Sequence, residues 1–150
     1  MGVVRFYHMT RSPVEATLAR LAQRAYEAGL RVEIRASDPA RLDWLDQKLW
    51  LGDESGFLPH GQAGGPHDAL QPVLLTASET LAPDTQCLMA IDGAPVEAAE
   101  AARLDRTFVL FDGNDPPALD HARGQWRMLT GAGAEAEYWS EDSGRWERKA

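Results

Sequence analysis

The residues best suited to binding chemistry lie in the stretch 121–127, which reads His-Ala-Arg-Gly-Gln-Trp-Arg. On a helix, Arg123 and Arg127 lie one turn apart and Trp126 is adjacent to them. Two guanidinium groups beside an indole suit the capture of a peptide that carries carboxylates and an apolar side chain. The spacing equally fits a helix whose core stripe is Leu119, Ala122, Trp126 and Leu129. In that case Trp126 is buried and both arginines simply face solvent.

A second candidate site is aromatic. Trp50 closes an apolar helical pattern, and Phe57 follows in a segment rich in glycine and proline. Two such aromatics can pack together under a loop, or they can form an exposed anchor pair for a partner protein. Both interpretations stay open at this point.

Catalytic chemistry finds less support. His60, His67 and Asp68 could ligate a metal in a hydrolase, but their spacing matches no familiar metal site, and they fit equally well as loop-anchoring side chains. Cys87 has apolar neighbours in a predicted strand, which predicts a buried and inert thiol. No nucleophile and base can be assembled from spacing, so we expect no catalytic residue, no resident metal and no cofactor.

The elements that must position these residues alternate along the chain. Ser12 and Pro13, and again Ser37 to Pro39, predict capped helix starts, and Gly29 predicts a helix end. A further helix is expected from Asp115-Pro116 to about Thr130, with Gly131 or Gly133 after it. Strands are predicted at 3–7, 32–34, 73–76, 87–91 and 108–111, a short helix near 95–103, a long loop at 52–72 and a hairpin or frayed end from 137.

Alternating strands and helices predict an α/β sandwich with a parallel core. The sequence carries neither G-x-G-x-x-G after the first strand nor G-x-x-x-x-G-K-[ST] anywhere, so a nucleotide-binding loop is not expected.

Length and composition indicate one globular domain spanning 1–150, with 44% hydrophobic and 25% charged residues. The net charge of -8 argues against duplex DNA binding. That charge is uneven: residues 1–36 carry six arginines and three glutamates, whereas residues 37–120 carry four basic and fifteen acidic side chains. An anionic partner should therefore dock near an end of the sequence. One cysteine excludes an internal disulfide, and no apolar run approaches a membrane span, which together favour the cytoplasm.

Several groups of residues, in order along the chain, resemble the chi subunit family of bacterial DNA polymerase III. The most specific is the run Leu42-Asp43-x-x-Asp46-x-x-Leu49-Trp50 followed by Phe57-Leu58-Pro59-His60. Phe6-Tyr7 precedes it, and 72–75, 108–111 and the Arg123-x-x-Trp126-Arg127 helix follow in order. The resemblance covers about 6–131, and the tail from 134 matches weakly.

The resemblance implies a three-layer Rossmann-like sandwich with a mixed, mainly parallel sheet. It also implies a noncatalytic adaptor of the clamp-loader complex, with two protein partners. Arg123, Trp126 and Arg127 match the positions that bind the acidic C-terminal tail of single-stranded DNA-binding protein. Trp50 and Phe57 match the positions that face the psi subunit, and they could instead serve another partner or only the fold. A further basic position of the last helix is here Leu119, which should shift part of the positive charge to Arg103, Arg106, Arg145 or Arg148.

Overall fold

The computed structural model describes residues 2–50, 60–63, 72–78 and 80–150, apart from the side chain of Trp50. Its strands are β1 (Val3–Met9), β2 (Val32–Ala36), β3 (His60–Gln62), β4 (Val73–Thr76), β5 (Cys87–Ile91), β6 (Arg106–Asp112), β7 (Ala136–Ser140) and β8 (Glu147–Arg148). They form one sheet in the order β3-β4-β2-β5-β6-β1-β7-β8. In the described part of the chain, every neighbouring pair is parallel except β7–β8.

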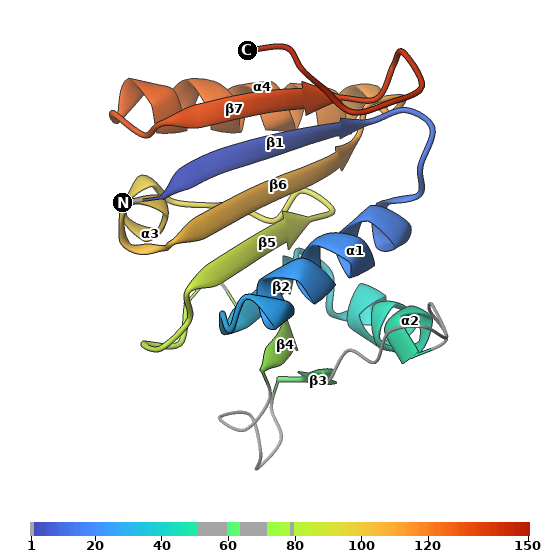
Figure 1. Ribbon diagram of the computed structural model, residues 1–150, viewed down its shortest axis with the longest axis vertical. Coiled ribbons are helices and arrows are strands. Elements are labelled where there is room, and N and C mark those ends of the chain that lie inside the picture. The colour runs from blue at the N-terminus through green and yellow to red at the C-terminus, as the bar shows by residue number, and fades with distance from the viewer. Residues whose placement is uncertain (1, 51–59, 64–71, 79) are drawn as a thin grey trace.

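Four helices cover the two faces of this sheet. One face packs against α1 (Val14–Glu27) and α2 (Pro39–Trp50), and the other against α3 (Ala98–Arg103) and α4 (Pro116–Gly131). Figure 1 shows α1 and α2 on the opposite side of the sheet from α4. The predicted three-layer sandwich with a mixed, mainly parallel sheet is therefore confirmed. None of the helices in the described ranges is long and apolar enough to cross a bilayer.

Strand β1 divides its side chains between two hydrophobic cores because successive residues of a strand point to opposite faces. Val4 and Phe6 are fully buried in the core under α3 and α4. Tyr7 and Met9 contribute to the core under α1 and α2. The strand that heads the chain thus connects both cores.

The glycines predicted to end helices do so. Gly29 and Gly133 have φ of 81° and 93°, a conformation that favours glycine over residues with a Cβ. The N–H of Ala134 donates to the Leu129 carbonyl at 3.0 Å, which closes the last turn of α4. The predicted strands and helices all form, with ends moved by a few residues.

Two sequence expectations are wrong. Residues 60–62, expected within a loop, form β3, because they pair with β4 through backbone hydrogen bonds. Three residues are too few for the sequence pattern to predict a strand. The serines do not cap helices either. Ser12 donates its hydroxyl to Glu141, and Ser37 donates to the Asp92 carbonyl at 2.5 Å. At the start of α2 it is Asp38 that accepts the N–H of Ala40, at 3.0 Å.

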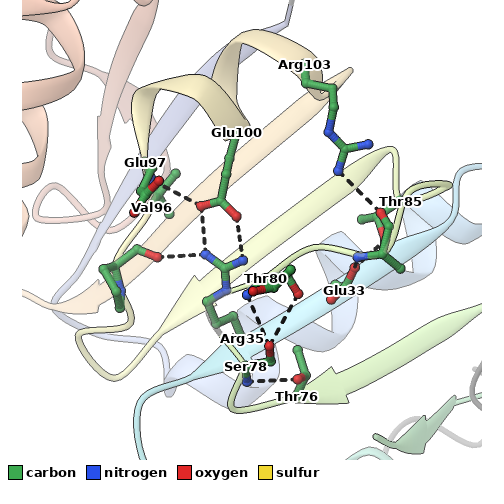
Figure 2. Close-up of polar contacts among 12 residues, drawn as sticks. Glu33, Arg35, Thr76, Ser78, Thr80, Thr85, Val96, Glu97, Glu100 and Arg103 are labelled. Carbon is green, nitrogen blue, oxygen red and sulfur yellow. Dashed lines mark hydrogen bonds and ion pairs between the residues drawn. The ribbon is translucent and has the colours of Figure 1, made fainter.

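A buried ion pair lies beneath β2 (Figure 2). The Arg35 side chain is 1% exposed, and its guanidinium donates to both carboxylate oxygens of Glu100, at 2.9 and 2.7 Å, and to the Pro95 carbonyl at 2.9 Å. Burial by itself raises the pKa of Glu100, but the hydrogen bonds from Arg35 and the Glu97 N–H outweigh it and lower the pKa. This pair fixes α3 on the sheet.

A buried carboxylate on β2, Glu33, holds the connection between β4 and β5 through hydrogen bonds. Glu33 is 3% exposed and accepts hydrogen bonds from the Thr85 hydroxyl and, at 2.9 Å, from the Ala82 N–H. Figure 2 shows Glu33 and Thr85 side by side, with Ser78 bonded to Thr76 and Thr80 nearby. Polar contacts therefore hold the β4–β5 connection against the sheet face that carries α3 and α4.

Breaking the buried pair should be costly. Glu100→Gln keeps the side-chain volume but leaves Arg35 charged and unpaired, so we expect the free energy of unfolding to fall by about 3–5 kcal/mol. Urea denaturation followed by circular dichroism measures this change. Glu135→Gln, at an exposed position away from this pair, is the matched control and should cost less than about 0.5 kcal/mol. A loss below 1 kcal/mol for Glu100→Gln would mean that the pair does not fix α3.

Candidate functional site

Helix α4 has a buried face that matches the predicted core stripe. Ala122 and Leu129 are fully buried, and Leu119 packs partly buried against the same core. Trp126 joins them at the edge, because its ring meets Phe6 edge-on with centroids 5.3 Å apart. Trp126 therefore packs against the core stripe while part of its indole stays accessible, which leaves its binding role a prediction.

Both candidate arginines are on the outer side of α4. Arg123 and Arg127 are exposed, and neither guanidinium has an ion pair with a carboxylate in the described part of the chain. Met128, next to Arg127, is 40% exposed and is the most exposed large apolar side chain among the described residues. We call these three residues the α4 surface. It offers two guanidinium forks free to bind carboxylates, beside an apolar contact.

Tyr138 of β7 completes the edge of this surface, and sequence reasoning missed it. Its ring meets Trp126 edge-on with centroids 5.8 Å apart, and its hydroxyl is hydrogen-bonded to His8 Nδ1 at 2.8 Å. Burial raises the pKa of Tyr138, while the nearby Arg123 charge acts in the opposite direction. The pairing of β7 with β1 places the Tyr138 ring beside α4. The residues around 138 contain no pattern that predicts this long-range pairing.

The aromatic pair of the second candidate site falls largely outside the described structure. Trp50 is the last residue of α2. Its side chain, and Phe57 altogether, lie outside the described residues. The role predicted for these two aromatics therefore stays a prediction.

His60, the first candidate ligand of the metal-hydrolase alternative, is engaged in a contact with Asp46. His60 is 4% exposed, and its Nε2 lies 3.1 Å from the Asp46 carboxylate and 3.2 Å from the Asp46 carbonyl. This contact anchors β3 to α2, as the alternative interpretation of His60 expected. His67 and Asp68 lie outside the described residues. Among the residues the structure does describe, no three His, Cys, Asp or Glu side chains gather in a way that could hold a metal ion.

Cys87 is also structural. It is fully buried in β5, and burial raises the pKa of its thiol to about 12. The burial predicted from the sequence is confirmed, and the thiolate that nucleophilic attack requires is disfavoured at neutral pH.

The turn from β1 to α1 is where a dinucleotide-binding fold holds phosphate. Here an internal carboxylate occupies it. Glu141, 5% exposed, accepts the backbone N–H groups of Thr10, Arg11 and Ser12 at 3.1, 2.8 and 2.5 Å. Its second oxygen accepts the Ser12 hydroxyl at 2.8 Å. Burial raises the pKa of Glu141, but these donors outweigh it and lower the pKa below 4.5.

The fold and this occupied turn define a doubly wound α/β protein without a phosphate-binding loop after its first strand. The chain belongs to the DNA polymerase III chi subunit family (HolC), whose sequence profile matches residues 1–137. It is 34% identical over 82 residues to DNA polymerase III subunit chi of Pseudomonas aeruginosa, covering 53% of this chain and 56% of that one. It is 27% identical over 70 residues to a probable DNA polymerase III subunit chi of Rickettsia prowazekii, covering 47% and 42%. The chain thus spans about half the length of these relatives.

The Glu141 contact makes a prediction about pH. Glu141→Gln can turn its amide oxygen toward the three N–H donors and its NH₂ toward the Ser12 hydroxyl, so it removes the negative charge but keeps an acceptor. A neutral acceptor forms weaker hydrogen bonds than a carboxylate, so we expect a loss of about 1–2 kcal/mol of unfolding free energy at pH 7. Because the folded-state pKa of Glu141 is lowered, its stabilisation is complete above about pH 4.5 and is lost as the pH falls through that lowered value. The variant should therefore lose less stability than the parent between pH 7 and pH 3, measured by urea denaturation. Asp142→Asn, at an exposed neighbouring position, serves as the control and should follow the parent.

Trp126 should matter to stability more than either arginine does. Trp126→Ala removes a ring packed against Phe6 and Tyr138, and we expect it to cost about 3 kcal/mol. Arg127→Ala should change stability by less than about 0.5 kcal/mol, because its side chain is exposed and has no carboxylate partner among the described residues. Thermal denaturation distinguishes the two. Equal losses would contradict the assignment of Trp126 to the core and Arg127 to the surface.

Proposed function

We propose that this chain is a noncatalytic adaptor of the DNA polymerase III clamp-loader complex. In this role the α4 surface binds the acidic C-terminal tail of single-stranded DNA-binding protein, and the region of Trp50 and Phe57 contacts the psi subunit. Membership of the chi family supports the role. The observation that carries the site is the pair of exposed arginines, Arg123 and Arg127, one helical turn apart and without carboxylate partners in the described structure. The same proposal includes a cytoplasmic location, where a replisome subunit would act.

The α4 surface has the chemistry that such a tail requires. Carboxylates of the tail form charge-assisted hydrogen bonds with the two guanidinium forks. The terminal phenylalanine contacts Met128 and the accessible edge of Trp126. The local charge is positive although the protein carries a net charge of -8, so the acidic remainder of the chain disfavours binding to a DNA strand itself.

The affinity of one tail should be modest. A short peptide buries little surface and loses conformational entropy on binding, so a dissociation constant on the order of micromolar is expected. An oligomeric binding protein presents several tails, and simultaneous engagement raises the apparent affinity. The adaptor then holds the clamp loader near coated single-stranded DNA without binding the strand.

The psi-facing role of Trp50 and Phe57 rests on the family alone. Trp50 ends α2, and α2 is tied to β3 by the Asp46–His60 contact and by a 2.9 Å hydrogen bond from Gln62 to Asp43. These contacts give the end of α2 a fixed base from which a partner could be contacted. An interaction with a different protein through the same two aromatics is the alternative.

A fluorescent peptide with the tail sequence tests the proposal. Fluorescence anisotropy should show micromolar binding that weakens between 50 and 300 mM salt, because the added ions screen the arginine–carboxylate attraction. Arg123→Ala/Arg127→Ala should weaken binding at least about tenfold, equivalent to 1.4 kcal/mol. A peptide without its final phenylalanine should bind more weakly than the full tail.

Two controls sharpen the result. Lys48→Ala removes one exposed positive charge from α2 and should leave binding within about twofold of the parent, since charges far from the site contribute little. Trp50→Ala should also retain tail binding, because the proposed psi contact lies on another surface. Unchanged binding in the Arg123→Ala/Arg127→Ala variant would refute the α4 site, and no binding at high micromolar peptide would refute tail recognition.

A further inference from the structure

A cavity of about 210 Å³ lies between α1 and the C-terminal hairpin formed by β7 and β8. It is on the sheet face that carries α1, whereas α4 covers the opposite face. In Figure 1, α1 crosses in front of the central strands and leaves the β7 end of that face uncovered by a described helix. The residues that line the cavity are Tyr7, Thr17, Arg20, Leu21, Arg24, Trp139 and Trp146. We call it the hairpin pocket.

Aromatic side chains form one wall of the hairpin pocket and are held in place by the fold. Tyr7 and Trp146 meet edge-to-face, with centroids 5.0 Å apart and an interplanar angle of 80°. Tyr7 also packs on Phe108 at 5.8 Å. Trp139 lies beside Tyr7 in the β1–β7 register, and its Nε1 donates to Glu137 at 3.0 Å. Fixed rings of this kind suit a single inserted aromatic side chain.

The opposite wall is positively charged. Arg20 and Arg24 lie one turn apart on α1, both are exposed, and neither has an ion pair with a carboxylate in the described part of the chain. Glu137, on the same face of β7 as Trp139, is already paired with Arg5 at 3.4 Å and with Arg148 at 3.8 Å. The unpaired charge that remains at this pocket is therefore positive.

A buried hydroxyl lies in the pocket lining. Thr17 is 3% exposed, and its Oγ1 has no hydrogen-bond partner in the structure as described. Buried polar atoms nearly always have a partner, and one left without costs about 1–3 kcal/mol. A ligand that presents a carbonyl or N–H group at the pocket would supply the missing partner.

We propose that the hairpin pocket binds an acidic peptide segment of a partner protein, with one aromatic side chain between Tyr7, Trp139 and Trp146 and its flanking carboxylates on Arg20 and Arg24. A peptide backbone has the N–H and carbonyl groups that Thr17 lacks. A nucleic acid strand fits less well, because its many phosphates would meet a protein with a net charge of -8 and only two unpaired arginines here. This site is separate from the α4 surface and does not depend on it.

Tryptophan indole resonances in a ¹⁵N-labelled sample test the proposal directly. The probe is a pentapeptide with phenylalanine between two pairs of aspartates, acetylated and amidated so that it has no chain-terminal charge. The indole N–H signals of Trp139 and Trp146, assigned with Trp139→Phe and Trp146→Phe, should shift with a dissociation constant below 1 mM. The Trp126 signal reports separately on any binding of the same probe at the α4 surface. A peptide with serine in place of phenylalanine should bind at least fivefold more weakly.

Paired variants then locate the charge. Arg20→Ala/Arg24→Ala should abolish the shifts, whereas Arg123→Ala/Arg127→Ala, with the same change in net charge on the other face, should retain them. Circular dichroism melts confirm that both variants are folded. Absence of shifts at millimolar probe, or shifts that persist in Arg20→Ala/Arg24→Ala, would overturn the proposal. Shifts produced by a single-stranded thymidine oligonucleotide but not by the peptide would overturn it as well, in favour of nucleic acid. Because Trp126 reports on α4 independently, failure here leaves tail binding unaffected.

Discussion

A turn that leaves a parallel strand and enters a helix exposes backbone N–H groups, and these groups need an acceptor. In this protein the acceptor is Glu141, which satisfies Thr10, Arg11 and Ser12 at once. The carboxylate reaches them because β7 pairs with β1 in parallel and ends beside the same turn. The contact therefore places the hairpin that follows, and with it Trp146 against Tyr7. The hairpin pocket exists because the turn is closed by a residue from the other end of the chain.

The arginines of this structure fall into two groups, those that form ion pairs within the fold and those that are exposed without a carboxylate partner in the described structure. Arg35 is buried and fully committed to Glu100, so its charge stabilises the fold. Arg123 and Arg127 on one face, and Arg20 and Arg24 on the other, are exposed without carboxylate partners in the described structure. With thirteen arginines and only two lysines in the chain, residue type alone says little about which of them bind a partner.

The sequence predicted what depends on local chemistry. The strands at 73–76 and 87–91 and the helix ends at Gly29 and Gly133 follow from periodicity and from glycine conformation. What it missed depends on long-range partners. Ser12 donates to Glu141, which is 129 residues away in the sequence, and Arg35 donates to Glu100, which is 65 residues away. A single sequence contains no sign of such pairings. For Trp126 it allowed both core and surface, and the β1–β7 pairing that decides its packing is again long-range.

The position of β1 has a consequence for synthesis on the ribosome. This strand is translated before the other described elements, yet it lies between β6 and β7, whose residues are translated about a hundred residues later or more. Neither of its hydrogen-bonding neighbours has left the exit tunnel while the first half of the domain is being translated. The segment that contains β1 therefore remains without its strand partners while the elements that follow it are translated. Assembly of the sheet around β1 is a late event, completed only after the last helix has been made.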